Sequence, residues 1–269
     1  MKLSTALYSA LVAGAVAANV DLALVETEAA KYDTLTYINY QLTYSCAERS
    51  AIRWWYTLGG DLNAASRPSS FYFDPNYTKK CQQKSTKAYG ADSGYDRGHL
   101  VASAHLRNSE AERHESHYMT NIAPQIAGFN RGIWERTEAI EACYRTLNGG
   151  IKTFGGLKYN ETDNDDFVAG WGIKTPDYWW KVVLGKDDAG KDQVIAWLFP
   201  NRENLGPLDD YLTSVAAIES QLIDGLGAIA VPEALKSVVA DGSWEIPSGC
   251  GRGRMAEEAD DDVDQDNKA

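Results

Sequence analysis

Apolar positions along this chain of 269 residues follow a strand-like pattern in several short runs and a helix-like pattern in others. β-branched and aromatic residues dominate the strand-like runs, and such residues favour extended backbone. The strands predicted from these runs are 35–44, 51–58, 99–102, 151–154, 167–173, 178–184 and 194–199. Gly155-Gly156 is interpreted as a turn after residues 151–154, because paired glycines interrupt regular structure.

Helix-forming residues or a helical spacing of apolar residues indicate four helices. The predicted helices are 109–118, 130–147, 208–226 and 232–239. The first begins at Ser109, a residue type that caps helix N-termini, and the second stops at Gly149-Gly150. Because no internal repeat or long linker divides the chain, we predict a single α+β domain over residues 19–251.

The two ends of the chain differ from the part between them. Residues 1–18 combine a basic Lys2, a short apolar run and small residues before the boundary, the pattern of a secretory signal peptide. A membrane anchor is the alternative, but spanning a bilayer takes about 20 apolar residues, and this run is shorter. Residues 252–269 are rich in acids, which predicts a disordered tail. We therefore expect a secreted protein with no membrane segment.

The four cysteines form an even set, which in a secreted chain predicts two disulfides with three possible pairings. Cys46–Cys81 with Cys143–Cys250 is preferred, because the first pair then stays within the N-terminal half. Asn76 and Asn160 each begin a glycosylation sequon, which places both on the surface of a secreted protein.

The net charge of −12 is unusual for a protein that binds nucleic acid, because phosphate affinity comes from Lys and Arg. Much of the negative charge lies in residues 256–269, which hold seven acids and one lysine. The central segment is richer in cations. Its arginines are Arg97, Arg107, Arg113, Arg131 and Arg136. An acidic surface with a basic cleft suits an enzyme that releases a polyanion better than a static nucleic-acid binder.

His99 is the first candidate catalytic residue. Arg97 lies two positions before it, so on extended backbone the two side chains point to the same face, and Asp96 points to the other. An arginine can fork onto a phosphate, and its charge lowers the pKa of a nearby imidazole toward the neutral form that a general base needs. A buried polar turn with no catalytic role is the alternative.

Asn130 and Glu138 are the next candidates, at the start and in the middle of the predicted helix 130–147. An asparagine there is interpreted either as an N-cap or as a neutral oxygen ligand for Mg²⁺, which keeps several waters and takes few protein ligands. Glu138, eight residues on, could hold a metal-bound water or be a solvated helix carboxylate.

Three linked motifs carry a family resemblance. Asp96-Arg97-Gly98-His99 is followed by Asn121-Ile-Ala-Pro-Gln125 and then by Phe129-Asn130-Arg-Gly-Ile-Trp134-Glu-Arg-Thr-Glu138. In this order and spacing the set resembles the DNA/RNA non-specific endonuclease family, the sugar-nonspecific ββα-metal nucleases, over roughly residues 50–250. The resemblance implies a ββα-metal fold with a central, mostly antiparallel sheet flanked by helices.

The resemblance also implies a role for each candidate. His99 would be the general base, Asn130 the one direct protein ligand of Mg²⁺, with Mn²⁺ as an alternative, and Glu138 the holder of a water in the metal shell. Arg97 would contact phosphate. An upstream arginine would stabilise the transition state, and Arg67 is the preferred match.

Arg53 is left open as the alternative for that upstream arginine. The expected substrates are DNA and RNA, single- and double-stranded, cleaved to products with 5′-phosphate. Little sequence preference is expected, because the candidate groups address phosphate and not bases. A homodimer is left open.

Two other functions compete with this interpretation. The first is a catalytically silent secreted module that binds nucleic acid or glycan. The second is a zinc phosphoesterase that uses His99, His105, His114 and His117. Because no thiol or acid accompanies these histidines in a recognised pattern, His105, His114 and His117 are instead expected to be exposed helix residues.

Overall fold

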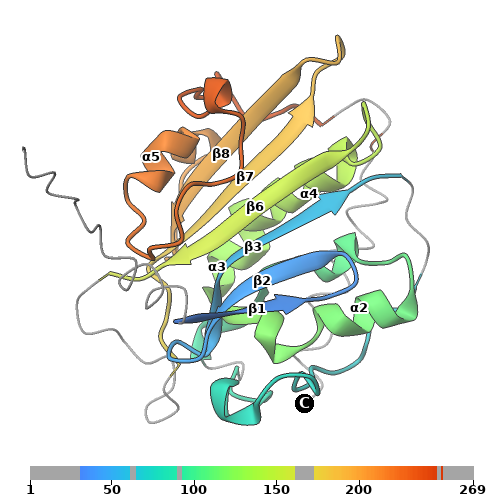
Figure 1. The fold of residues 1–269 in the computed structure, drawn as a ribbon, viewed down its shortest axis with the longest axis vertical. Helices are drawn as coiled ribbons and strands as arrows, with labels where there is room; N and C mark the ends of the chain where they lie inside the picture. Colours follow the sequence, from blue (N-terminus) through green and yellow to red (C-terminus); the bar gives the residue numbers. More distant parts are fainter. Residues whose placement is uncertain (1–30, 61–64, 90–92, 161–172, 247–249, 251–269) are drawn as a thin grey trace, which may run out of the picture.

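The computed structural model describes residues 31–60, 65–89, 93–160, 173–246 and 250, and its main element is a six-stranded antiparallel sheet in the order β1-β2-β3-β6-β7-β8 (Figure 1). The strands are β1 (Tyr32–Thr36), β2 (Tyr40–Ser45), β3 (Ser50–Leu58), β6 (Ile151–Lys158), β7 (Tyr178–Lys186) and β8 (Asp192–Pro200). Strands β3 and β6 are neighbours with Leu58 opposite Ile151, although all residues from 59 to 150 lie between them in sequence.

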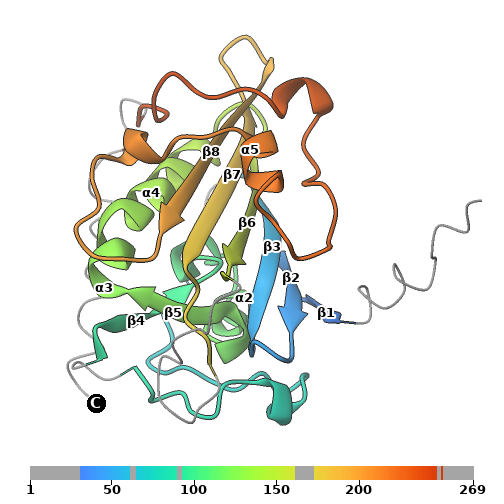
Figure 2. The ribbon, with the colours of Figure 1, turned by 90° about the vertical axis from the view of Figure 1, so that its left-hand side faces the viewer.

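A second, two-stranded antiparallel sheet forms within that intervening stretch. It pairs β4 (Tyr95–His99) with β5 (Ile122–Ile126). The helical segments around it are η1 (Lys79–Cys81), η3 (Ser103–His105), α2 (Glu110–Ser116), η4 (Met119–Asn121), α3 (Ala127–Phe129), the π-helical η5 (Asn130–Trp134) and α4 (Glu135–Tyr144). Figure 2 shows α3 and α4 on one face of the large sheet and α5 (Val215–Glu219) on the other.

Apolar side chains fill both sides of the large sheet. The larger core lies between the sheet and α4 and includes Trp54, Trp134, Trp179 and Trp197, all almost fully buried. Trp134 from η5 packs edge-on against Trp179 of β7, with ring centroids 5.1 Å apart. Since a large apolar side chain gains about 1.5–3 kcal/mol on full burial, these indoles anchor the helical segment to the sheet.

A buried polar cluster also joins α4 to the sheet. Glu141 of α4 is fully buried and accepts hydrogen bonds from Tyr56 Oη at 2.5 Å, Thr153 Oγ1 at 2.6 Å and Lys181 Nζ at 2.7 Å. Burial alone would raise the pKa of Glu141, but the Lys181 ammonium and these hydrogen bonds hold it below its usual value. Lys181 also lies over the ring of Trp134, 4.1 Å from its centroid.

Three of the predicted strands are corrected. Residues 35–44 form parts of two strands, β1 and β2, with a reversal between them. The strand at His99 begins at Tyr95 and ends at His99, so it precedes the predicted 99–102. Gly155-Gly156 lies inside β6 and makes no turn.

The glycines of β6 are explained by packing. A Cβ atom at Gly155 would come 2.2 Å from Trp54 Cε2, and one at Gly156 would come 2.4 Å from Trp180 Cε2. Each glycine therefore leaves space for an indole on one face of the strand. The predicted strands 51–58, 178–184 and 194–199 are confirmed, whereas 167–172 lies outside the described residues.

The C-terminal helices are much shorter than predicted. Residues 208–226 contain only η6 (Leu208–Tyr211) and α5, and 232–239 contains only η7 (Glu233–Leu235). Leu212 pairs with Trp197 at the edge of β8, and the Thr213 amide donates to Ala196 O at 3.0 Å. This pairing with the sheet breaks the helix that the apolar spacing predicted.

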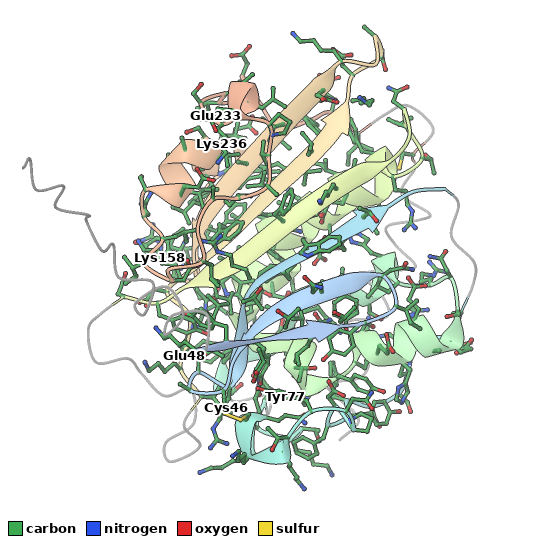
Figure 3. All side chains as sticks on the ribbon, in the orientation of Figure 1. Cys46, Glu48, Tyr77, Lys158, Glu233 and Lys236 are labelled. Carbon is green, nitrogen blue, oxygen red and sulfur yellow. A yellow bond between two sulfur atoms is a disulfide. The ribbon has the colours of Figure 1, made fainter. Side chains whose placement is uncertain are left out.

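Both predicted disulfides are confirmed. Cys46–Cys81 joins the turn after β2 to η1, and Cys143–Cys250 joins α4 to the C-terminal segment. Figure 3 labels Cys46, which lies in the connection between β2 and β3 at one end of the sheet. Among the described residues, no helix is long and apolar enough to cross a membrane.

Candidate active site

His99 and Arg97 share one face of β4, as their spacing predicted. Both residues are half-buried, whereas Asp96 and Gly98, which alternate with them along the strand, are buried. The ring of Phe71 contacts both: the Arg97 guanidinium lies over it at 4.7 Å, and its centroid is 5.5 Å from that of His99. Phe71, which was not predicted as a site residue, therefore fixes the base and the cation relative to each other.

The surroundings of His99 favour the neutral imidazole. Its pKa is well below the usual value, first because the ring is desolvated and then because His117, Arg67, Arg97 and Arg113 oppose a positive charge. Its Nε2 atom is buried and has no hydrogen-bond partner in the part of the chain that the structure describes. A neutral imidazole among fixed cations can accept a proton from a water that attacks phosphate.

Gly98 is required by the strand next to it. The Gln125 side chain of the paired strand β5 occupies the space beside Gly98. A Cβ atom at Gly98 would lie 2.4 Å from Gln125 Oε1 and 2.5 Å from Gln125 Cβ. A larger residue would push β4 away from β5 and would displace the adjacent His99. The glycine of the motif thus serves close packing and not a special backbone angle.

Asp96 connects β4 to the helical segment. It accepts hydrogen bonds from Asn130 Nδ2 at 2.9 Å and from Arg131 Nε and Nη2 at 2.8 and 2.6 Å. Because a carboxylate can only accept, the amide nitrogen of Asn130 faces Asp96, and its Oδ1 atom is directed elsewhere. Asp96 therefore orients Asn130 with its oxygen available as a ligand.

Asn130 is not the N-cap of a helix, so that alternative is wrong. The helical segment begins earlier, at Ala127, and Asn130 opens the π-helical η5. Gly132 has non-helical backbone angles, φ −113° and ψ −109°, which place a kink between Asn130 and α4. Wide π turns recur at functional sites because they turn a side chain out of the regular helical pattern.

Glu138 lies on α4 beyond this kink, with a half-buried side chain. Its backbone carbonyl is 3.1 Å from His105 Nε2. The single continuous helix predicted over 130–147 is not formed, and Trp134, which lies between the two candidates in sequence, is fully buried in the core. The role of Glu138 stays a prediction.

The two candidate upstream arginines are in different places. Arg53 forms an ion pair with Asp224, Nε to Oδ2 2.7 Å, and donates to Gly227 O at 2.8 Å, both in the segment after α5. Arg67 instead acts electrostatically on His99 and is the largest charged influence on His117. These electrostatic contributions, together with the engagement of Arg53 by Asp224, favour Arg67 over Arg53 as the arginine that acts on the base.

The expectation of exposed histidines is wrong for His105 and His117, which are 0% and 1% exposed. Helix α2 ends at Ser116, so His117 leaves the helix and turns into the protein, whereas half-buried His114 stacks on Tyr72 at 4.3 Å. The sequence gives no signal for this turn. In the described ranges no group of three or more His, Cys, Asp and Glu could hold a metal, which disfavours the zinc alternative.

The residues present fit one magnesium ion. Asn130 offers a single neutral oxygen, oriented by a buried carboxylate, and Mg²⁺ typically takes one or two protein oxygens and keeps its waters. Softer ions such as Zn²⁺ or Cu²⁺ would prefer imidazole or thiolate ligands, whereas Mn²⁺ shares the preference of Mg²⁺ for oxygen. The donor chemistry thus agrees with the predicted ion class.

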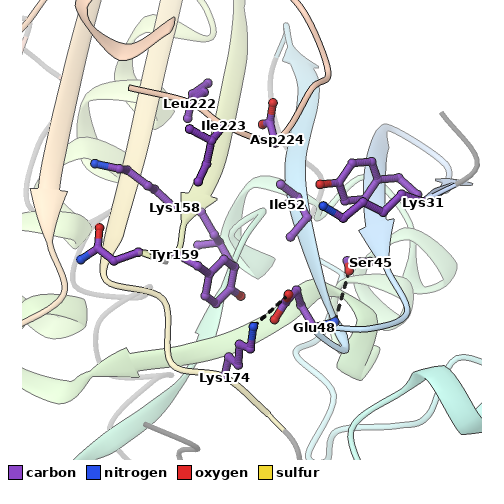
Figure 4. Close-up of a pocket in the computed structure, with 13 residues that line it drawn as sticks. Lys31, Ser45, Glu48, Ile52, Lys158, Tyr159, Lys174, Leu222, Ile223 and Asp224 are labelled. Carbon is purple, nitrogen blue, oxygen red and sulfur yellow. Dashed lines mark hydrogen bonds and ion pairs between the residues drawn. The ribbon is translucent and has the colours of Figure 1, made fainter. Parts of the chain in front are cut away.

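A pocket of about 170 Å³ lies elsewhere, near the ends of β3 and β6 (Figure 4). Its polar lining includes Glu48, which accepts from Lys174 Nζ at 3.3 Å, and Lys158. None of the predicted site residues lines it. The site around His99 is therefore separate from this pocket.

Known proteins with similar sequences are nucleases. Endonuclease G, mitochondrial, of Bos taurus is 26% identical over 195 residues, 68% of this chain and 64% of the relative. The Homo sapiens protein of that name is 26% identical over 169 residues, 58% of this chain and 57% of the relative. Nuclease C1 of Cunninghamella echinulata var. echinulata is 24% identical over 204 residues, with coverages of 70% and 79%. The chain spans less than two thirds of the length of the bovine and human relatives.

These relatives correct the expectation of secretion, which is wrong. The bovine and human proteins and Nuclease 1 of Schizosaccharomyces pombe are named as mitochondrial. A short apolar run after one basic residue does not by itself distinguish a secretory signal from other N-terminal segments. Residues 1–18, on which the expectation rested, lie outside the described residues.

The fold and the family agree. A solved structure of the EndoG/EndoGI complex superposes with a TM-score of 0.61 at 22% identity, covering 72% of this chain and 86% of that one, and this likeness confirms the predicted α+β, ββα-metal fold. The family model described as DNA/RNA non-specific endonuclease matches residues 21–233. The chain therefore belongs to the DNA/RNA non-specific endonuclease family.

Proposed function

We propose that this protein is a metal-dependent endonuclease that hydrolyses phosphodiester bonds of DNA and RNA with little sequence preference and leaves 5′-phosphate ends. The observation that carries the proposal is the pairing of two groups. His99 shares β4 with Arg97 in surroundings that lower its pKa, and Asp96 of the same strand orients Asn130 on η5. The activity is assigned to one domain, residues 19–251, with 252–269 as a tail.

In the proposed reaction His99 is the general base. It removes a proton from a water that attacks the phosphorus in line with the leaving 3′ oxygen. The low pKa of His99 keeps the ring neutral before the reaction, because burial and the nearby arginines disfavour the imidazolium. Phe71 holds the ring in position through its contact at 5.5 Å.

Arg97 and Arg67 provide the positive charge in this mechanism. Arg97 would bind a non-bridging phosphate oxygen, and Arg67 would stabilise the charge that grows on phosphorus oxygens in the transition state. Both act on His99 electrostatically, which supports their placement beside the reacting phosphate.

Asn130 would be the direct protein ligand of one Mg²⁺, with Mn²⁺ as an alternative, and Glu138 would hold a water of its shell. When bound, the ion supplies positive charge for the phosphate and the leaving oxygen. The contribution of the chain is to fix Asn130: Asp96 accepts its amide protons at 2.9 Å and so turns Oδ1 outward.

Digestion of supercoiled plasmid and of RNA, with Mg²⁺ or with EDTA, tests the proposal. We expect cleavage of both substrates with Mg²⁺, none with EDTA, and a loss of at least about 10²-fold for His99→Ala, as expected for a general base. His114→Ala is the matched control, because His114 is a half-buried histidine that stacks on Tyr72. Unchanged cleavage by His99→Ala would contradict the mechanism, and no cleavage by the wild type with any divalent ion would favour a silent binding module.

A further inference from the structure

His117 lies beside the proposed base. The ring centroids of His99 and His117 are 5.2 Å apart, and the ring planes are inclined by 72°. Phe71 packs against both rings, with centroids 5.5 Å from His99 and 5.0 Å from His117. The Nε2 atoms of both histidines are buried, and within the described residues neither has a hydrogen-bond partner.

The contacts of His117 define which of its nitrogens carries the proton. Its Nδ1 atom lies 3.2 Å from the carbonyl oxygen of Arg113, which can only accept. The Ser116 hydroxyl already donates its one proton to that same oxygen, at 2.7 Å. That hydroxyl oxygen also lies 3.1 Å from Nδ1 and, with its own proton given to Arg113 O, accepts there. A proton on Nδ1 satisfies both contacts of this nitrogen, and we assign that tautomer to neutral His117, which leaves a lone pair on Nε2.

His117 is also held firmly and kept neutral. Arg113, whose carbonyl receives Nδ1–H, is itself buried and donates to Ala65 O and to Ser103 Oγ. The pKa of His117 is lowered to about 3, first by burial and then by Arg67, so its Nε2 stays an acceptor at neutral pH.

We propose that His117 is a positioning residue for His99: its Nε2 accepts the Nε2–H of His99, so that Nδ1 of His99 is the basic nitrogen. The His117 ring is held through Nδ1, so the His99 ring is the one that would rotate about χ2, a torsion that is broad for histidine, to bring its Nε2 to that of His117. The bond fixes the tautomer of the base, as carboxylates and carbonyls do for other catalytic histidines. This inference rests on the proposed function, because it assigns the atom that takes the proton.

A neutral acceptor suits this location better than a carboxylate. Arg67 and Arg113 both act on His117, and a carboxylate in its place would pair with them instead of with His99. An imidazole that is already bonded through Nδ1 accepts through Nε2 without attracting the cations. An imidazole in this position therefore orients His99 without placing a negative charge beside Arg67 and Arg113.

The first test is ¹⁵N NMR of the full chain labelled at histidine, without metal or substrate. We expect His99 to be protonated on Nε2 in the wild type and to become a mixture of tautomers in His117→Met. His117→Gln should preserve the wild-type tautomer, because a side-chain carbonyl oxygen replaces the accepting nitrogen. Protonation of wild-type His99 on Nδ1 would overturn the inference without any variant.

The second test is kinetic. We expect kcat to fall by about 10–100-fold in His117→Met with little change in KM, and to recover largely in His117→Gln, whose shape matches that of methionine. His114→Met, in helix α2 just before His117, is the control. An unchanged kcat in His117→Met, or equal losses in the Gln and Met variants of equal thermal stability, would overturn the inference. The NMR result does not depend on cleavage, so failure of the nuclease proposal would be seen separately, as activity that ignores His99→Ala.

Discussion

The buried pair of Lys181 and Glu141 leads to a specific prediction about stability. Lys181→Met removes the ammonium but keeps most of the aliphatic volume, and Glu141→Gln removes the negative charge but keeps an acceptor for Tyr56 and Thr153. Both partners are almost completely buried, at 1% and 0% exposure, with Nζ and Oε2 2.7 Å apart. Each single substitution therefore leaves one charge in the interior without its partner.

The size of the effect follows from this burial. Breaking one side of a buried ion pair costs about 3–5 kcal/mol, because the remaining charge keeps its desolvation penalty. In the double variant no charge is left inside. The two hydroxyl hydrogen bonds at 2.5 and 2.6 Å can still be made to the glutamine oxygen. We expect the double variant to lose only about 1–2 kcal/mol, an amount set by imperfect packing and by one lost hydrogen bond.

Urea or guanidinium unfolding with disulfides intact measures these changes as shifts of the midpoint at constant m value. The control is Lys186→Met, which breaks an exposed pair with Asp192 at 2.6 Å and should change the free energy of unfolding by no more than about 1 kcal/mol. If the double variant is as unstable as the sum of the two single variants, the ion pair is not the reason for the loss, and the reasoning is refuted.

The remaining predictions concern the site and pH. Asp96→Ala frees the Asn130 amide, so the Mg²⁺ concentration for half-maximal cleavage should rise about 10–100-fold; an unchanged requirement would contradict the orienting role. The pKa of His99 is lowered, so kcat/KM should stay high on acidification through pH 6.5 and fall only below it; a pH–rate profile that falls at 6.5 would oppose this. The pKa of His105 is lowered to about 4. As pH falls from 6.5 to about 4, His105 therefore takes up a proton in the unfolded chain but not in the folded protein, and the free energy of unfolding should drop by about 3 kcal/mol. His105→Gln should reduce this loss, which denaturant titrations at pH 7 and pH 4 measure.

The local sequence predicted those parts of the fold in which local pattern and tertiary structure agree. Residues 51–58 and 194–199 are rich in β-branched and aromatic residues, and both formed strands as expected, although Trp55 and Thr57 of the first are exposed. The spacing of Arg97 and His99 predicted their shared face, because side-chain alternation is a property of any strand. These features require no knowledge of distant contacts.

The failures arise where a distant partner decides the outcome. Gly155-Gly156 has the pattern of a turn, but Trp54 and Trp180 from other strands occupy the space beside these glycines. The apolar spacing of 208–226 predicts a helix, but Leu212 pairs with the edge strand instead. Within a single sequence neither partner can be recognised.

The same distinction applies to the site. The linked motifs predicted His99 and Asn130 as site residues. In the structure Asp96, on the same strand as His99, accepts a hydrogen bond from Asn130. Asn130 was expected at a helix start, because a π turn has no signature in the residues around it. His117 was missed because a histidine just beyond a polar helix looks solvent-exposed until the direction of the chain after Ser116 is known.

The neighbouring positions of Leu58 and Ile151 have a consequence for how the protein folds. All elements of the candidate site lie in a closed excursion that leaves the large sheet at one residue and returns opposite it. Closing a loop of about 90 residues costs roughly 4 kcal/mol of chain entropy before β3 and β6 gain their contacts. Folding is therefore expected to be slow, with the joining of these two strands as a late event. The same arrangement lets the site evolve independently of the large sheet. Residues 59–150 can change in length or sequence while Leu58 and Ile151 stay paired.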